Sequence, residues 1–212
     1  MPSAATILDG FGAAANVWRA VAVAWHALLG ALLCGLWVGW RPSKRFAGAL
    51  LCAPLVSVAA LAWVGNNPFN GTAFAALSLA LAALALRFPP AVVDISSPTS
   101  RVVGAILIAF GWGYPHFLQT HSSVAYLYAA PLGVLPCPTL SAVLGTSLLL
   151  NLFDSQSWSV LLSFAAVVYG LFGAFGLGVG IDLVLLAGGI ALAIAAISDK
   201  QRSDTPLARY AG

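Results

Sequence analysis

The stretch "VLLSFAAVVYGLFGAFGLGVGIDLVLLAGGIALAIAAI", residues 160–197, decides the fold class, because Asp182 is its only charged residue. A membrane-spanning helix needs about 20 apolar residues, so the stretch is long enough for two. Its centre, "GAFGLGVGID", is rich in glycine and favours a tight turn between spans at roughly 158–176 and 179–198. The alternative, one continuous helix, would be far longer than the hydrocarbon core of a bilayer. The stretch therefore predicts a helical hairpin in a membrane.

The composition of the whole chain points the same way. The 212 residues are 61% hydrophobic and 7% charged, whereas a soluble domain carries about 25% charged residues. The mean hydropathy is +0.96 and the pI is near 9.0. Nucleic-acid-binding proteins cluster their basic residues on one face, but here these residues are scattered between apolar runs. The composition therefore excludes a soluble domain and gives no signal for nucleic acid. Three cysteines do not make a disulfide framework.

Five further apolar runs complete the predicted bundle, at roughly 17–39, 46–65, 72–87, 102–120 and 137–153. Together with the hairpin they give an all-α, polytopic membrane bundle of about seven transmembrane helices. We expect a single integral-membrane domain over 1–212. Residues 1–16 form an outer lead-in, without the basic start of a cleaved signal peptide, and residues 199–212 form a cytoplasmic tail.

Basic residues predict the orientation of this bundle. Eight fall on one side of the seven-span topology and only Arg19 falls on the other; the eight are Arg41, Lys44, Arg45, Arg87, Arg101, Lys200, Arg202 and Arg209. An excess of Lys and Arg in short loops marks the cytoplasmic side. We therefore expect the N-terminus outside and the C-terminus in the cytoplasm, in the inner (plasma) membrane of a bacterium.

Polar residues inside the apolar runs are the candidate functional residues, because ionisable groups at membrane depth are costly and usually functional. His116, His121, Cys137 and Asp182 are predicted to lie towards the outer side, and His26 near mid-depth. The outer four would line an outward-facing vestibule. Asp182 could relay protons or cations there, or could be a solvated carboxylate at the N-terminus of the last helix.

No cofactor is predicted, but two weak possibilities follow from these residues. His116 and His121 are five apart, which places them on different faces of a helix, so only a loop could bring them together. With Cys137 they would then bind a copper or zinc ion. The alternative is histidines that bond to loop carbonyls. His26 could be an axial haem ligand, although no second histidine lies at a matching depth, or it could bond to a neighbouring helix.

Sequence signatures of membrane enzymes and pigments are missing from the chain. The last span has no lysine for a retinal Schiff base, and neither a G-x-x-x-x-G-K-[ST] loop nor an H-E-x-x-H motif occurs. Ser141 and Thr139 have no obvious base beside them in the sequence. We therefore expect no enzymatic activity.

The motif "LPCPT", residues 135–139, precedes the fifth span. Pro138 suits the first turn of a helix, which leaves Pro136 just outside it and Cys137 extended, since a residue before proline avoids the helical region. Thr139 then supplies a hydroxyl in the first turn. We predict that the motif serves backbone geometry, with the thiol secondary.

The same motif carries a resemblance. "LPCPT" with the leucine-rich span after it, "NNPFNGTAF" after the second span and "ILDGFGAAANVW" before the first resemble an uncharacterised bacterial multi-pass membrane family, domain-of-unknown-function family 6064. The resemblance implies a polytopic membrane fold and no known activity. The lead-in here is poorer in charge than the family leads us to expect.

Two functions fit these observations. The first is a non-catalytic accessory subunit of a larger membrane complex, with the lipid bilayer and other membrane subunits as its partners and no nucleic acid. The second is a small transporter or channel with its vestibule near His116, His121, Cys137 and Asp182. The scarcity of buried polar groups favours the first, because a pathway for a polar solute needs polar lining groups.

Overall fold

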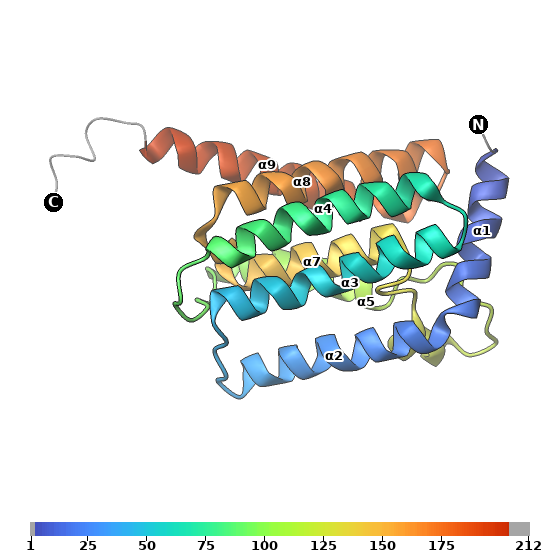
Figure 1. The fold of residues 1–212 in the computed structure, drawn as a ribbon, viewed down its shortest axis with the longest axis horizontal. Coiled ribbons are helices and arrows are strands. Elements are labelled where there is room, and N and C mark those ends of the chain that lie inside the picture. The colour runs from blue at the N-terminus through green and yellow to red at the C-terminus, as the bar shows by residue number, and fades with distance from the viewer. Residues whose placement is uncertain (1–2, 204–212) are drawn as a thin grey trace, which may run out of the picture.

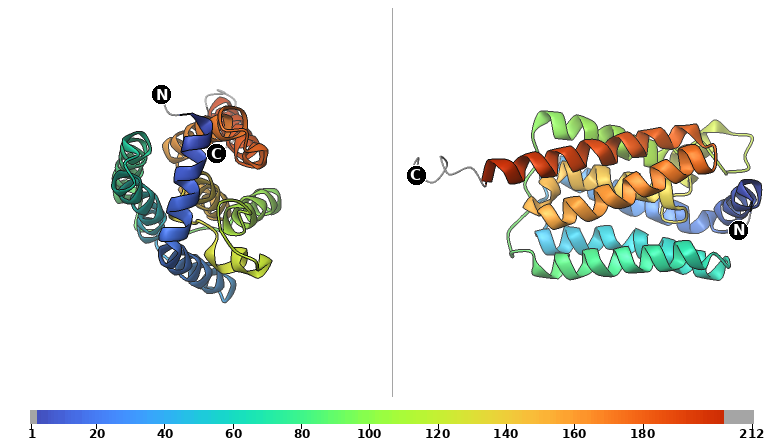
Figure 2. Two further views of the ribbon diagram at one scale, coloured as in Figure 1. Left: turned by 90° about the vertical axis from the view of Figure 1, so that its right-hand side faces the viewer. Right: turned by 90° about the horizontal axis from the view of Figure 1, so that it is seen from above.

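The computed structural model describes residues 3–203, and every regular element among them is helical. Seven helices run side by side along one axis (Figures 1 and 2): α2 (Arg19–Trp37), α3 (Lys44–Val64), α4 (Pro68–Arg87), α5 (Pro98–Trp112), α7 (Pro136–Leu149), α8 (Gln156–Leu171) and α9 (Leu183–Ser203). The predicted all-α bundle is therefore confirmed. Residues 204–212, with Arg209 and most of the predicted tail, lie outside the described residues.

Four of these helical segments are long and apolar enough to cross a membrane: Arg19–Trp37, Lys44–Val64, Pro68–Arg87 and Gln156–Gly176. Three more are apolar but shorter: Pro98–Trp112, Pro136–Leu149 and Gly180–Ile194. The described residues thus support a helical membrane protein with four candidate spans. The count of seven predicted from the sequence goes beyond this finding.

Two spans were predicted to extend too far towards their C-terminal ends. The span expected at 102–120 ends at Trp112, because Pro115 follows closely and cannot continue a helix. The span expected at 137–153 ends at Leu149. Its last predicted residues form the 3-10 segment η2 (Asn151–Asp154), in which Asn151, Phe153 and Asp154 have left-handed backbone angles.

Helix α7 occupies the centre of the bundle, packed against α3, α5, α8 and α9 (Figure 1). Its closest partner is α5, where a side chain on Gly145 would collide with the Gly104 carbonyl. Every residue of α7 from Pro138 to Leu148 is buried. Its hydroxyls therefore need internal partners: Ser141 donates to the Leu107 carbonyl at 2.8 Å, and Ser147 accepts from the Trp158 indole at 3.0 Å.

The two ends of the bundle differ. Helix α1 (Ala4–Val17) crosses one end at a steep angle to the other helices, and α9 finishes at the opposite end (Figures 1 and 2). We call these the α1 end and the far end. At the α1 end the segment after α5 forms the short helices η1 (Ser123–Ala125) and α6 (Tyr126–Ala129), which pack against α2 and α5.

Aromatic rings and an ion pair close the far end. Phe153 stacks on Phe88, with ring centroids 5.1 Å apart, and meets Trp158 edge-on at 5.0 Å. Beside them the buried Lys44 ammonium pairs with Asp154, and with Asp94 at 3.7 Å. These contacts tie the start of α3 to the loops that follow α4 and α7.

Candidate functional site

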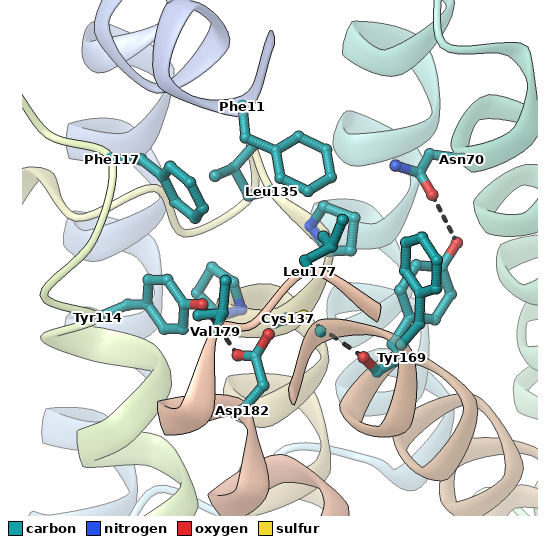
Figure 3. A pocket seen from close by; sticks show the side chains of 14 residues that line it. Phe11, Asn70, Tyr114, Phe117, Leu135, Cys137, Tyr169, Leu177, Val179 and Asp182 are labelled. Atoms are coloured by element: carbon teal, nitrogen blue, oxygen red, sulfur yellow. Dashed lines mark hydrogen bonds between the residues drawn. The ribbon is translucent and has the colours of Figure 1, made fainter. Parts of the chain in front are cut away.

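A pocket lies at the α1 end of the bundle, between α1, α4, α7, α8 and the turn before α9 (Figure 3). Its internal cavity volume is about 20 Å³. Phe11 of α1 and Phe117 of the loop after α5 lie on one side of it, and Asp182 lies on the other (Figure 3). A cavity of this size holds about one water molecule, so a larger ligand can enter only when the lining residues move apart.

Asp182 is the charged residue of this pocket, and only 2% of it is exposed. Its Oδ1 accepts a hydrogen bond from the Tyr114 hydroxyl at 2.9 Å. The thiol of Cys137, which donates to the Tyr169 carbonyl at 4.0 Å, lines the same pocket. Oδ2 lies so close to Gly173 that any side chain at this position would collide with it. The structure therefore brings together two of the predicted site residues, Cys137 and Asp182.

The glycine-rich turn between α8 and α9 directs Asp182 inward. Helix α8 continues as one π-helical turn, η3 (Phe172–Gly176), where the Leu177 amide donates to the Phe172 carbonyl at 2.9 Å. Gly178 then reverses the chain with φ +71°, and the 3-10 turn η4 (Gly180–Asp182) leads into α9. The predicted turn and the position of Asp182 at a helix start are confirmed. The alternative of a solvated carboxylate is wrong, because the wide π turn folds the segment back over the bundle.

The prolines of "LPCPT" act one position earlier than predicted. Helix α7 begins at Pro136, and Leu135 before it is extended, with φ −111° and ψ 152°. Pro136 was expected just outside the helix and Cys137 was expected to be extended; both expectations are wrong. Because a proline keeps the residue before it out of the helical region, Leu135 is extended. Prolines are tolerated in the first turn of a helix, where the amide they lack would have no helical partner.

The Thr139 side chain forms hydrogen bonds with the backbone and does not line the pocket. The preceding segment is buried but not helical, so its amides and carbonyls need partners inside the protein. Gly133, with φ +71°, donates its amide to the Thr139 hydroxyl at 2.8 Å. Its carbonyl accepts from the Ser57 hydroxyl at 2.7 Å, which in turn accepts from the Trp25 indole at 3.1 Å. We call this arrangement the Gly133 turn.

Helix α1 covers the pocket through few contacts. The Asn16 side chain donates to the Phe117 carbonyl at 2.9 Å and accepts from the Gln119 amide at 2.9 Å. Phe11 meets the Phe117 ring edge-on, with centroids 5.8 Å apart. These contacts fix α1 to the loop after α5 rather than to the helices below it.

The predicted histidines do not line the pocket. His116 is exposed at its rim, with its ring 6.1 Å from the Tyr114 ring, and His121 is exposed in the loop beyond. Within residues 3–203, no group of three or more His, Cys, Asp or Glu side chains is arranged to hold a metal ion. A copper or zinc ion on His116, His121 and Cys137 therefore stays a prediction.

His26 is 3% exposed in α2, and both of its ring nitrogens are engaged. Nδ1 lies 2.8 Å from the Ala22 carbonyl and Nε2 lies 2.8 Å from the Trp112 carbonyl. Neither nitrogen is free for a haem iron in this conformation. The geometry matches the alternative of a histidine bonded to a neighbouring helix.

Three polar residues of the pocket were missed in the sequence: Tyr114, Asn70 and Tyr169. The Tyr169 hydroxyl donates to Asn70 Oδ1 at 3.0 Å, across the pocket wall. Burial, together with the Asp182 carboxylate, raises the pKa of the Tyr114 hydroxyl, which keeps it a hydrogen-bond donor. Two of the three could have been suspected because they are polar residues at the ends of apolar runs: Tyr114 in "GWGYPHF" and Asn70 in "NNPFN". Of these three groups, the Tyr114 hydroxyl orients the Asp182 carboxylate.

Comparison with models of protein families, with curated proteins and with solved structures found no match. The resemblance to the uncharacterised multi-pass family therefore stays a prediction, and the proposals below rest on the geometry of this chain.

Proposed function

We propose that the protein binds a small solute in the pocket at the α1 end, as the outward-facing site of a small transporter or channel. Asp182 carries this proposal. An ionisable group buried at such a position costs free energy, and here Tyr114 and Gly173 hold it in place. The pocket therefore favours the transporter over the accessory subunit.

The proposal includes the seven-span topology. The 14-residue α7 is enclosed by other helices, so its length need not match the hydrocarbon thickness, and a short span such as α5 can be accommodated by local thinning of the bilayer. Exposed Arg41, Arg45, Arg87 and Arg101 follow or precede helix ends at the far end, whereas Arg19 begins α2 at the α1 end. By the positive-inside rule the far end faces the cytoplasm of a bacterial cell, with the N-terminus outside.

The far end supports the same assignment. The ring cluster of Phe88, Phe153 and Trp158 and the Lys44–Asp154 pair close that end. With the proposed site at the α1 end and packed side chains at the far end, the described conformation corresponds to the outward-facing state of this proposal. A transport cycle would have to open the ring cluster.

The competing function is a non-catalytic accessory subunit without a site of its own. Both functions are non-enzymatic. In this proposal the Cys137 thiol, which donates to the Tyr169 carbonyl at 4.0 Å, is not a nucleophile.

The experiment is a solute screen on purified protein in mild detergent. Thermal unfolding is measured with a panel of small cations, anions and neutral molecules, for the wild type and for Asp182→Asn. Asp9→Asn is the matched control, because Asp9 is exposed on α1. We expect at least one solute to stabilise the wild type and the control but not Asp182→Asn, and to enter vesicles that contain the wild type. If no solute does so, while partner subunits co-purify equally with all three proteins, the accessory function replaces the proposal.

A further inference from the structure

The charge balance of the pocket indicates the sign of its ligand. Among the described residues that line the pocket, Asp182 is the only one with a formal charge. Arg19 contacts the Tyr128 hydroxyl at 3.4 Å, and the other described Lys and Arg side chains belong to the far end. His116 interacts electrostatically with Asp182 from the rim, but it does not line the pocket. A buried carboxylate without a positively charged partner destabilises the protein, because its charge has lost hydration without compensation. A cationic ligand supplies that partner.

The lining indicates the kind of cation. Aromatic rings come from three separate segments: Phe11, Tyr114, Phe117, Tyr169 and Phe172. Hard metal cations take six or more oxygen ligands, and this lining offers few oxygen atoms. A cation with alkyl groups needs fewer hydrogen bonds and is attracted to aromatic faces.

We infer that the pocket binds a small alkylammonium ion, with the Asp182 carboxylate as its counter-charge and the rings of Phe11 and Phe117 against its alkyl groups. This inference rests on the proposed function and names the substrate class of the same site. The Tyr114 hydroxyl orients the carboxylate (Figure 3) and is a positioning group. Helix α1 carries Phe11 and must move for the ligand to enter.

The test uses tetramethylammonium chloride as the probe, with sodium chloride as the ionic control and tert-butanol as a neutral molecule of similar size. Thermal unfolding and calorimetric titration are measured on the full chain in detergent. We expect tetramethylammonium alone to stabilise the wild type. Its dissociation constant should rise about tenfold or more in Asp182→Asn, which loses the charge pair, and a few-fold in Phe11→Leu, which keeps apolar volume but loses the ring.

Five results would overturn the inference. Equal stabilisation by sodium would indicate a hard cation, and equal stabilisation by tert-butanol would indicate an uncharged ligand. If Asp182→Asn does not fold, Phe11→Leu decides alone, and unchanged tetramethylammonium affinity counts against the inference. A neutral or anionic solute that stabilises the wild type but not Asp182→Asn removes the alkylammonium class and leaves the proposed function intact. The absence of any stabilising solute removes both.

Discussion

Gly173 lacks a side chain, and this is what allows a carboxylate to lie inside the π turn at the end of α8. Any Cβ at Gly173 would occupy the space of Asp182 Oδ2. Gly180, in the same turn, has open space at its Cβ position and no left-handed φ. The two glycines therefore differ in function although the sequence presents them alike.

Gly173→Ala should displace the Asp182 carboxylate, whereas Gly180→Ala should be tolerated. Overpacking of a buried position costs about 1–3 kcal/mol, and an exposed substitution changes stability by about 0.5 kcal/mol or less. Thermal unfolding in detergent measures the difference. Solute binding by Gly173→Ala should also be lost. Equal melting temperatures for the two variants would contradict the close packing of Gly173 on Asp182.

Thr139→Val should destabilise the protein more than Thr146→Val or Cys137→Ala. The first change leaves the buried amide of Gly133 without an acceptor, which costs about 1–3 kcal/mol. Thr146 donates only to the Ala142 carbonyl of its own helix, so its loss strands no amide. Cys137→Ala removes one small side chain, worth about 1 kcal/mol. Chemical or thermal unfolding measures the loss of stability in each of the three variants. If Cys137→Ala loses the most stability, the thiol and not the backbone geometry is the main role of the motif.

At the scale of elements, α1 and α7 depart most from what their sequences suggest. Helix α1 looks like a lead-in to the first span, yet it turns at Trp18, whose backbone angles are φ −98° and ψ 22°, and covers the pocket. Helix α7 has no polar face, because its apolar residues and hydroxyls are spread around the helix. Such a helix suits the centre of the bundle, where other helices surround it. Neither arrangement follows from periodicity, because both depend on contacts between distant segments.

Asn16→Ala should loosen α1 from the loop after α5, because it removes the two hydrogen bonds that join the Asn16 side chain to that loop. The measurement is the rate at which Cys137 reacts with a membrane-impermeant maleimide added from outside, in a chain with Cys34→Ser and Cys52→Ala. We expect the reaction to be at least several-fold faster in Asn16→Ala. Asp9→Asn is the control and should react like its parent. Identical rates for all three would show that α1 does not limit access to the pocket.

At the scale of the whole molecule, the orientation proposed from charge has a direct test. Reporter fusions at the two ends should place the N-terminus outside and the C-terminus in the cytoplasm, because exposed arginines gather at the far end. Charge reversal of Arg41 and Arg45 to Asp should weaken this preference. Two ends on the same side of the membrane would rule out an odd number of spans.

The apolar runs predicted the helices well, because hydropathy reports directly on solubility in lipid. The predicted site was less accurate. Cys137 and Asp182 meet in the pocket, but His116 and His121 lie outside it, in a loop that Asn16 and Trp112 hold by hydrogen bonds. The inward direction of Asp182 depends on one π turn, and hydropathy carries no information on such a turn. The predicted spans ran past the true ends of the helices where a proline or residues with left-handed backbone angles interrupt the apolar sequence.

The Gly133 turn has a consequence for how the chain is made. Its amide and carbonyl find partners only from Thr139 and from Ser57 of α3, which the Trp25 indole of α2 supports. In lipid alone the Gly133 carbonyl would be unpaired, at a cost of several kcal/mol. Residues 131–149 therefore cannot settle in the bilayer until α2 and α3 are in place. During synthesis into vesicles, Ser57→Ala should delay the appearance of a protease-resistant core while leaving the insertion of the first two spans on schedule.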